Sequence, residues 1–196
     1  MTELILASAS PQRRDLLRTL GRPFRVVPPT ADEMLPAGIS PRQGAEELAR
    51  RKARSVATRL SQGLVLGADT LVAVGDRIIG KPRDREDAIR ILEILSRTRH
   101  EVITGLCLID VASNREIVAS DSTAIVMRRM TRSEIEAYVD SREGMDKAGA
   151  YAIQETGDRF VERVEGSLSN VIGLPLELLA ALLARMEGDP RRSAQS

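Results

Sequence analysis

A junction of small residues near the N-terminus has the composition of a phosphate-binding turn. Residues 4–7 are apolar and predict a short buried strand, and Ser10 with Pro11 predicts a helix start. Such a junction presents free backbone N–H groups and the positive end of the helix dipole. The hydroxyls of Ser8 and Ser10 and the guanidinium of Arg13 would complete a pocket for phosphate oxygens. A capped surface helix with solvated arginines has the same composition, so this motif alone leaves both interpretations open.

An aspartate and a lysine in the middle of the chain could cleave a phosphoanhydride. Asp69 follows an apolar run and is expected in a turn at residues 67–70, where its carboxylate could bind a metal or orient a water. Lys81 lies beyond a predicted hairpin that would fold it back toward Asp69, where an ammonium would neutralise charge developing on oxygen. The segment is not a P-loop, because the glycine-rich run before Gly80 is missing and Pro82 follows the lysine. A turn aspartate and an exposed turn lysine are the alternative interpretation.

Residues 146–154 form a third segment whose composition suits a ligand. Its small residues would let the backbone approach a ligand closely. Gln154 carries both a donor and an acceptor, which suits reading the edge of a base, and Lys147 could meet a triphosphate. A polar loop without a ligand has the same features.

Carboxylates are the metal ligands that the composition leaves available. With one cysteine, Cys107, and one histidine, His100, the chain excludes a zinc cage of paired thiolates and a histidine-rich site, and both residues are expected to be structural. A metal would therefore be a hard cation, Mg²⁺ or Mn²⁺, held by carboxylates, phosphates and water. Asp32 and Glu33 are candidate ligands, although isolated acidic residues are more often solvated. Lys52 lies in an arginine-rich helix, a pattern typical of a solvated face from which one cation could turn inward.

The composition limits the class of protein. Its 196 residues suffice for one domain, expected over residues 1–187 with a flexible tail at 188–196. Lys and Arg number 29 against 28 Asp and Glu, and a net charge of +1 argues against general binding of nucleic acid. No basic signal-peptide region and no run of roughly 20 apolar residues is found. We expect a soluble, cytoplasmic protein, and base rates favour a homodimer.

Alternating strand and helix patterns predict an α/β fold with a mixed sheet. The expected strands are residues 4–7, 24–27, 64–66, 71–74, 102–111, 117–127 and 160–164. The expected helices begin after the N-caps Ser10, Ser40, Asp84 and Thr131, and at Pro175. We expect the second helix to end near residue 60 and Gly75-Asp76 to form a hairpin turn.

The order of the motifs carries more information than any one of them. The segments LASASP-x-R at residues 6–13, GADT at 67–70, GKP at 80–82, DKAGAY-x-IQ at 146–154 and NVIGLP at 170–175 together resemble the Maf family. The resemblance extends from residue 4 to about residue 183. It implies a mixed, curved sheet flanked by helices in two lobes around a nucleotide cleft, similar to the inosine-triphosphate pyrophosphatases.

The resemblance also implies an activity and a set of residues. Maf proteins hydrolyse the bond between the α and β phosphates of nucleoside triphosphates and need a divalent metal. This hydrolysis removes non-standard nucleotides from the pool. Asp69 would be the general base and, with Glu33, would support the metal. The residues lining the phosphate side would be Ser8, Arg13, Lys52, Lys81 and Lys147.

The choice of base is implied by three positions. Thr70 and Gln154 match the branch that resembles dTTP/UTP pyrophosphatases, whereas Gln12 stands where many members of that branch carry arginine. A 7-methyl-GTP pyrophosphatase is the alternative enzyme. A regulator of cell division that binds nucleotide without turnover is the alternative from another class, and it would lose no chemistry on Asp69→Asn.

Overall fold

The computed structural model describes residues 2–154 and 156–188. Within these residues, a seven-stranded sheet has the order β2-β1-β3-β5-β6-β7, and β4 pairs with the C-terminal end of β3. The strands are β1 (Leu4–Ala7), β2 (Phe24–Val26), β3 (Leu64–Val74), β4 (Arg77–Ile79), β5 (Arg99–Asp110), β6 (Arg115–Met127) and β7 (Val161–Glu165). The helices are α1 (Pro11–Arg18), α2 (Pro41–Ala57), α3 (Arg85–Leu95), α4 (Arg132–Ser141), α5 (Leu168–Ile172) and α6 (Leu176–Glu187).

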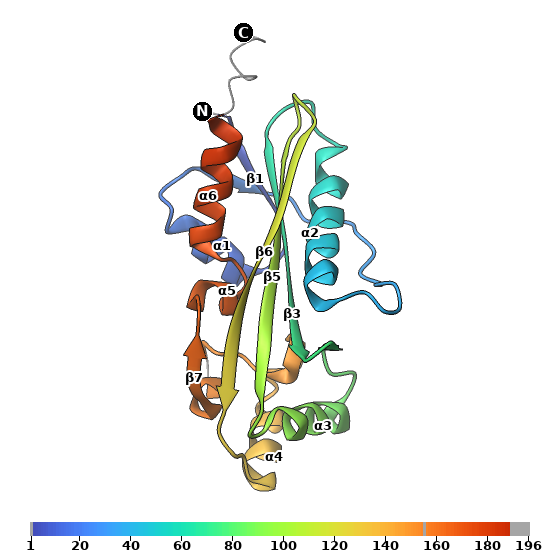
Figure 1. The fold of residues 1–196 in the computed structure, drawn as a ribbon, viewed down its shortest axis with the longest axis vertical. Helices are drawn as coiled ribbons and strands as arrows, with labels where there is room; N and C mark the ends of the chain where they lie inside the picture. The colour runs from blue at the N-terminus through green and yellow to red at the C-terminus, as the bar shows by residue number, and fades with distance from the viewer. Residues whose placement is uncertain (1, 155, 189–196) are drawn as a thin grey trace.

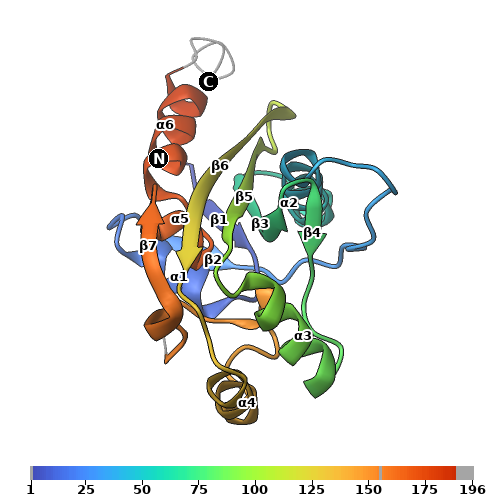
Figure 2. The same cartoon turned by 60° about the horizontal axis from the view of Figure 1, so that its bottom comes forward.

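Three long strands connect two groups of helices. β1 pairs in parallel with β2 and β3, and the remaining pairs are antiparallel, so the sheet is mixed. β3, β5 and β6 run along the length of the molecule, with α2 on one side of them and α1 and α6 on the other (Figure 1). α3 and α4 lie together at the bottom of the molecule in Figure 1, at the end that Figure 2 brings forward.

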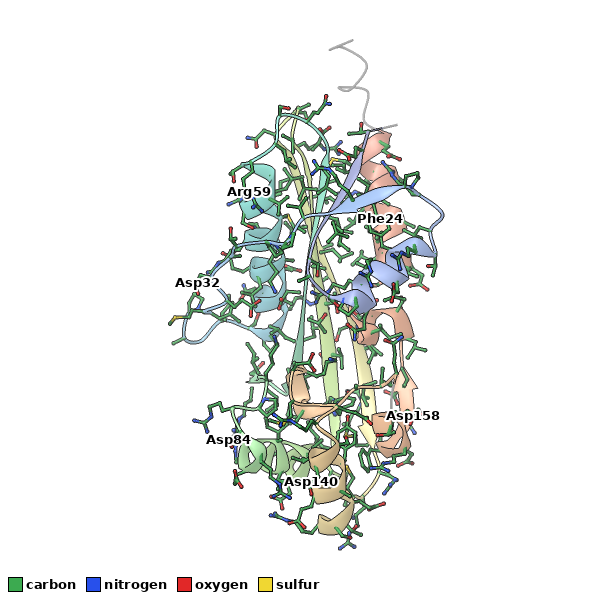
Figure 3. The ribbon with its side chains drawn as sticks, turned by 180° about the vertical axis from the view of Figure 1, so that it is seen from behind. Phe24, Asp32, Arg59, Asp84, Asp140 and Asp158 are labelled. Atoms are coloured by element: carbon green, nitrogen blue, oxygen red, sulfur yellow. The ribbon has the colours of Figure 1, made fainter. Side chains whose placement is uncertain are left out.

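The two largest hydrophobic clusters of the described residues lie toward opposite ends of the sheet and mark two lobes, upper and lower in Figure 1. The upper core contains Leu66 and Leu106 and packs against α1 and α6, while the lower core contains Tyr138 and Phe160 and packs against α3 and α4. Figure 3 shows Phe24, Asp32 and Arg59 in the upper lobe and Asp84, Asp140 and Asp158 in the lower one. The expected α/β fold with a mixed sheet and two lobes is confirmed.

The helix starts follow from local capping chemistry. The N-caps expected at Ser10, Ser40, Asp84 and Thr131 are all present, each with a side-chain oxygen that accepts a backbone N–H of the first turn. Ser40 and Thr131 form complete capping boxes. α2 ends at Ala57, slightly before the expected residue 60.

The expected turn around Asp69 is wrong. Residues 64–74 form one continuous strand, in which Asp69 lies opposite Gly105 and Thr70 opposite Thr104 on β5. The small residues of this segment suggested a turn by local propensity, but pairing with a long neighbouring strand overrides that propensity. Asp69 therefore projects from a rigid strand.

Some elements of the structure were not predicted from the sequence. α5 was not expected, and the expected polar loops after α4 contain short 3₁₀ turns at Ala148–Ala150 and Thr156–Phe160. Of the expected flexible tail, residues 189–196 lie outside the described residues. None of the helices in the described part of the chain is long and apolar enough to cross a membrane.

Two glycines let α2 lie directly on the sheet. A Cβ atom at Gly67 would stand 2.3 Å from the carbonyl oxygen of Ala49, and one at Gly105 would stand 2.3 Å from that of Ala45. Such distances are far inside van der Waals contact, so only glycine permits this approach of backbone to backbone. The close packing sets the height of α2 above the strand that carries Asp69.

We expect Gly105→Ala to push α2 away from the sheet. Overpacking of this kind costs about 1–3 kcal/mol, and here the obstructing atoms are backbone atoms that cannot rotate away. Urea unfolding of the variant beside wild type measures the loss. Gly80→Ala is the matched control, since a Cβ there meets no heavy atom within 4 Å, and it should change stability by less than about 0.5 kcal/mol. Equal stabilities of the two variants would contradict the steric account.

The residues expected to be structural, His100 and Cys107, are both buried in β5. His100 Nε2 lies 2.9 Å from the hydroxyl oxygen of Tyr151. Burial lowers the pKa of His100 to about 4, from an ordinary value of 6.5, and raises the pKa of the Cys107 thiol to about 12. His100 is therefore neutral in the folded protein at neutral pH.

The buried histidine should make the protein less stable in mild acid. Between the unfolded pKa of 6.5 and the folded pKa of about 4, the unfolded chain binds a proton that the native chain does not, so stability falls as pH falls through this window. Between pH 7 and pH 4.5 the loss should be about 2 kcal/mol.

Denaturant titrations at several pH values test this expectation. His100 is the chain's only histidine, so His100→Gln should show a flatter pH dependence over the same window. An unchanged pH dependence in that variant would assign the effect to other groups.

Candidate active site

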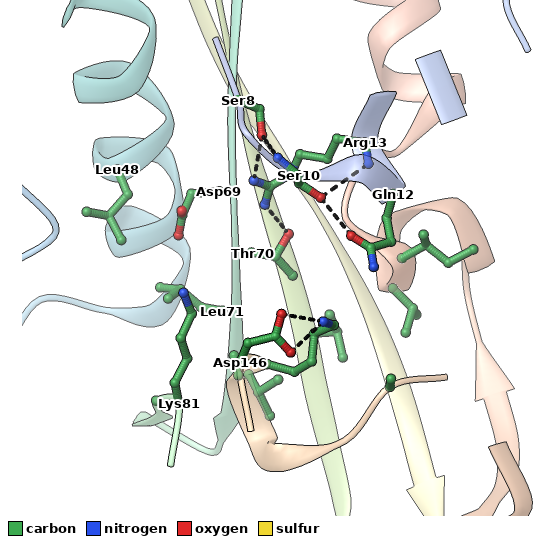
Figure 4. Close-up of a pocket in the computed structure, with 18 of the residues that line it drawn as sticks. Ser8, Ser10, Gln12, Arg13, Leu48, Asp69, Thr70, Leu71, Lys81 and Asp146 are labelled. Atoms are coloured by element: carbon green, nitrogen blue, oxygen red, sulfur yellow. Dashed lines mark hydrogen bonds and ion pairs between the residues drawn. The ribbon is translucent and has the colours of Figure 1, made fainter. Parts of the chain in front are cut away.

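A cavity of about 820 Å³ opens between the two lobes. Every site residue that the family resemblance implies lines it: Ser8, Gln12, Arg13, Glu33, Lys52, Asp69, Thr70, Lys81, Lys147 and Gln154. These residues come from distant parts of the chain, and Figure 4 shows how several of them surround β3. Asp32 does not line the cavity, because its carboxylate accepts the backbone N–H of Met34 at 2.9 Å within its own loop.

The turn from β1 into α1 forms one wall of the cavity. Ser10 caps α1, and its own backbone N–H donates to Ser8 Oγ at 3.2 Å. The Arg13 guanidinium is held across the sheet, where Nε donates to the carbonyl of Gly173 and Nη2 donates to Thr70 Oγ1, each at 2.9 Å. Burial lowers the pKa of Arg13, and the charges of Asp69 and Glu33 oppose that shift. The wall therefore presents a fixed cation beside the hydroxyls of a helix N-terminus.

A lysine and two carboxylates form a second set of polar side chains on the other side of β3. Lys52 on α2 turns inward and donates a hydrogen bond to Asp69 Oδ1, and its Nζ also lies 2.6 Å from Glu33 Oε1. The side chains of Lys52 and Asp69 are only 12% and 11% exposed, whereas that of Glu33 is 56% exposed. The hydrogen bond from Lys52 lowers the pKa of Glu33, and Lys81 and Arg13 lower it further by their charges. One lysine thus orients the nearly buried carboxylate of Asp69 and the exposed carboxylate of Glu33.

The lower lobe supplies two further lysines. The backbone N–H of Gly149 donates to the carbonyl of Gly80 at 3.2 Å, which ties together the segments that carry Lys81 and Lys147. Lys147 Nζ donates to both oxygens of Asp146 at 2.6 and 2.7 Å, and this interaction lowers the pKa of Asp146. Because Asp146 is largely exposed, this pair is open to exchange with a bound anion.

The floor of the cavity is apolar, and sequence reasoning missed it. Its lining includes Leu71, Val72, Val102, Tyr151, Ile153, Val171 and Ile172. In the sequence these residues have the ordinary pattern of buried strands and helices, so nothing separates them from the core. The combination of a cationic rim and an apolar floor suits a phosphorylated molecule that carries a flat organic group.

The acidic residues fit a hard divalent cation only in part. Among the described residues, there is no group of three or more His, Cys, Asp or Glu side chains placed to hold a metal. Asp69 and Glu33, which share Lys52, offer carboxylate oxygens to the cavity. This fits Mg²⁺ or Mn²⁺, which bind one or two carboxylates and take their other ligands from substrate phosphates and water.

Comparison with known proteins agrees with this geometry. A family model described as Maf-like protein matches residues 3–186. The chain belongs to the Maf-like family. The match covers both lobes and every residue of the cavity wall described above.

Curated members of the Maf-like family are similar to this chain over nearly their whole length. A dTTP/UTP pyrophosphatase of Pelotomaculum thermopropionicum is 45% identical over 185 residues, covering 94% of this chain and 97% of that protein. A dTTP/UTP pyrophosphatase of Anaeromyxobacter dehalogenans (strain 2CP-C) is 49% identical over 184 residues, 93% of each chain. One of Moorella thermoacetica is 46% identical over 184 residues, 94% of this chain and 95% of that protein.

We expect Lys52→Gln to lower the free energy of unfolding of the protein. The change leaves the nearly buried Asp69 carboxylate without its cation, which should cost about 1–3 kcal/mol of the free energy of unfolding. Lys147→Gln is the matched control, because its partner Asp146 is 76% exposed and an exposed pair contributes less than about 1 kcal/mol. Urea unfolding without nucleotide compares the two, and a larger loss in Lys147→Gln would contradict this ranking.

Proposed function

We propose that this protein hydrolyses the α–β phosphoanhydride of nucleoside triphosphates, with dTTP and UTP as preferred substrates, releasing the monophosphate and pyrophosphate. The observation that carries the proposal is Asp69, fixed by Lys52 on a rigid strand in a cavity rimmed by cations. The names of the similar family members support the reaction and the pyrimidine bases. The cytoplasm holds the pool of these substrates, so we place the activity there.

Asp69 acts as the general base in this mechanism. Lys52 donates to Oδ1, which orients the carboxylate and leaves Oδ2 to accept a proton from the attacking water. Because Asp69 projects from the middle of the paired strand β3, its carboxylate is already oriented before substrate binds.

The cations of the rim hold the phosphates. Arg13 and the hydroxyl of Ser8 bind phosphate oxygens from the upper lobe, and Lys81 and Lys147 bind them from the lower lobe. Lys147 exchanges its exposed partner Asp146 for the substrate as it does so. These groups neutralise the negative charge that moves onto the leaving pyrophosphate.

Glu33 and Asp69 are the residues that would hold a divalent cation together with the substrate phosphates. Bound there, Mg²⁺ or Mn²⁺ would add positive charge next to the anhydride. Gln12, Thr70 and Gln154 are the polar side chains of the cavity that we assign to reading the base.

Pyrophosphate release from a panel of nucleoside triphosphates tests the proposal. The panel contains dTTP, UTP, CTP, GTP and 7-methyl-GTP, with Mg²⁺ or Mn²⁺ and with a chelator. We expect release from dTTP and UTP that is lost with the chelator and falls by about 10²–10⁴-fold in Asp69→Asn, since the general base is gone.

Asp32→Asn is the matched control. It also neutralises a carboxylate, but outside the cavity, and asparagine can still accept the N–H of Met34, so activity should be retained. Release from 7-methyl-GTP alone would keep the mechanism and change the assigned base. No turnover of any nucleotide by folded, metal-supplied wild type would contradict the proposal and favour a non-catalytic nucleotide-binding protein.

A further inference from the structure

A chain of hydroxyl groups runs from the cavity into the interior. Thr70 and Thr104 are directly opposed on β3 and β5, and their Oγ1 atoms are 2.9 Å apart. Thr104 is fully buried and does not line the cavity, whereas Thr70 is partly exposed and does. Cross-strand threonines at this spacing hydrogen bond through their hydroxyls.

The backbone carbonyl of Asn170, at the buried end of this series of hydroxyl groups, determines the direction of each hydrogen bond in it. Thr104 Oγ1 lies 2.9 Å from the backbone carbonyl oxygen of Asn170, and a carbonyl oxygen can only accept. Thr104 therefore uses its single hydroxyl proton on Asn170. In the bond between the two threonines, Thr70 must then be the donor and Thr104 the acceptor.

The acceptor at the inner end is held in place by the Asn170 side chain. Its Nδ2 donates to the carbonyl of Val102 at 2.9 Å and to Thr123 Oγ1 at 3.0 Å. These bonds attach α5 to β5 and β6 and hold the Asn170 carbonyl over Thr104. The carbonyl also accepts the N–H of Gly173 at 3.0 Å, so it keeps a partner even without the Thr104 hydroxyl.

At the outer end, Thr70 has no proton left for a ligand. Its hydroxyl proton goes to Thr104, and one of its two lone pairs accepts Arg13 Nη2 at 2.9 Å. The lone pair that remains is its means of binding a substrate in the cavity. Thr70 can therefore accept a hydrogen bond from a ligand but cannot donate one.

Gln12, unlike Thr70, can offer a hydrogen-bond donor to a ligand. Ser10 Oγ donates to Gln12 Oε1 at 3.1 Å, which leaves the amide NH₂ as the group that Gln12 can offer to a ligand. Thr70 and Gln12 lie on the same side of β3 in the cavity (Figure 4). This wall thus combines an acceptor and a donor.

We propose that Thr104 is a positioning residue for base selection, because it makes Thr70 an acceptor toward the ligand and so favours bases with an N3–H donor. The inference rests on the proposed function. Uracil and thymine present N3–H beside a carbonyl oxygen, which complements the acceptor of Thr70 and the donor of Gln12. Cytosine has the same size but presents an unprotonated N3, so its lone pair faces the lone pair of Thr70.

The test compares the hydrolysis of UTP and CTP by Thr104→Val. The valine side chain has nearly the same shape as threonine but cannot accept a hydrogen bond from the Thr70 hydroxyl. Thr70 is then free to donate into the cavity, so the ratio of kcat/KM for UTP over CTP should fall by about tenfold, the effect of one hydrogen bond of roughly 1.4 kcal/mol. Thr104→Ser retains the hydroxyl and should keep the wild-type ratio. A structural role alone would lower the values for both nucleotides by the same factor.

A second variant and a binding assay cover the remaining outcomes. Thr70→Val removes the acceptor itself and should also bring the ratio toward one, even if Thr104→Val does not fold. The affinities of α,β-imido-UTP and α,β-imido-CTP, measured by calorimetry, should show the same change of ratio without requiring turnover. Selective binding of the uracil analogue by a wild type that hydrolyses nothing would refute the proposed function and retain this inference. An unchanged ratio in folded Thr104→Val or Thr70→Val, or no preference in wild type, would overturn it.

Discussion

The position of the whole site depends on one packing contact, the approach of α2 to bare backbone on β3 and β5. Gly67 and Gly105 lie under α2 where any side chain would collide with the carbonyls of Ala49 and Ala45. Because the helix lies so low, Lys52 reaches Asp69 across a short gap and the pair is almost buried. A helix standing a few ångströms higher would leave the carboxylate without its cation and open to water. The site geometry is therefore a consequence of backbone packing as much as of the charged residues themselves.

The polar groups that the upper lobe supplies to the site lie on opposite sides of β3. Strand alternation sends Asp69 toward α2 and Thr70 toward α1, so one strand serves a catalytic group on one side and a binding group on the other (Figure 4). Each group has a partner of low exposure that limits its freedom: Lys52 for Asp69, and Thr104 for Thr70. Fixed partners lower the cost of organising the site when substrate binds.

The two lobes supply different parts of the same cavity. The upper lobe contributes a helix N-terminus, Arg13 and the Lys52–Asp69 pair, while the lower lobe contributes Lys81, Lys147 and most of the apolar floor. The lobes have separate hydrophobic cores but share β3, β5 and β6. Continuous strands keep the cations of both lobes in register, which separate domains on a flexible linker would not do.

Sequence patterns were enough to predict the class of fold and most of the helix starts, and the family resemblance implied the polar site residues. Capping at Ser10, Ser40 and Thr131 is local chemistry, since a side chain bonds a backbone N–H three residues away, and such interactions can be predicted without the fold. The ordered motifs carry the resemblance to the Maf family, and that resemblance implied the polar residues that line the cavity.

How these residues meet depends on contacts between segments that are distant in the sequence. Local propensity placed Asp69 in a turn, but a ladder of bonds to β5, a strand distant in sequence, makes it part of β3. The inward turn of Lys52 depends on the height of α2, and the role of Thr104 depends on a carbonyl 66 residues away. The apolar floor has the same pattern as the core and is distinguished from it only by the space that it faces. Interactions between distant segments have no signature in local sequence, because the entropy of bringing them together is overcome only by the packing of the complete fold.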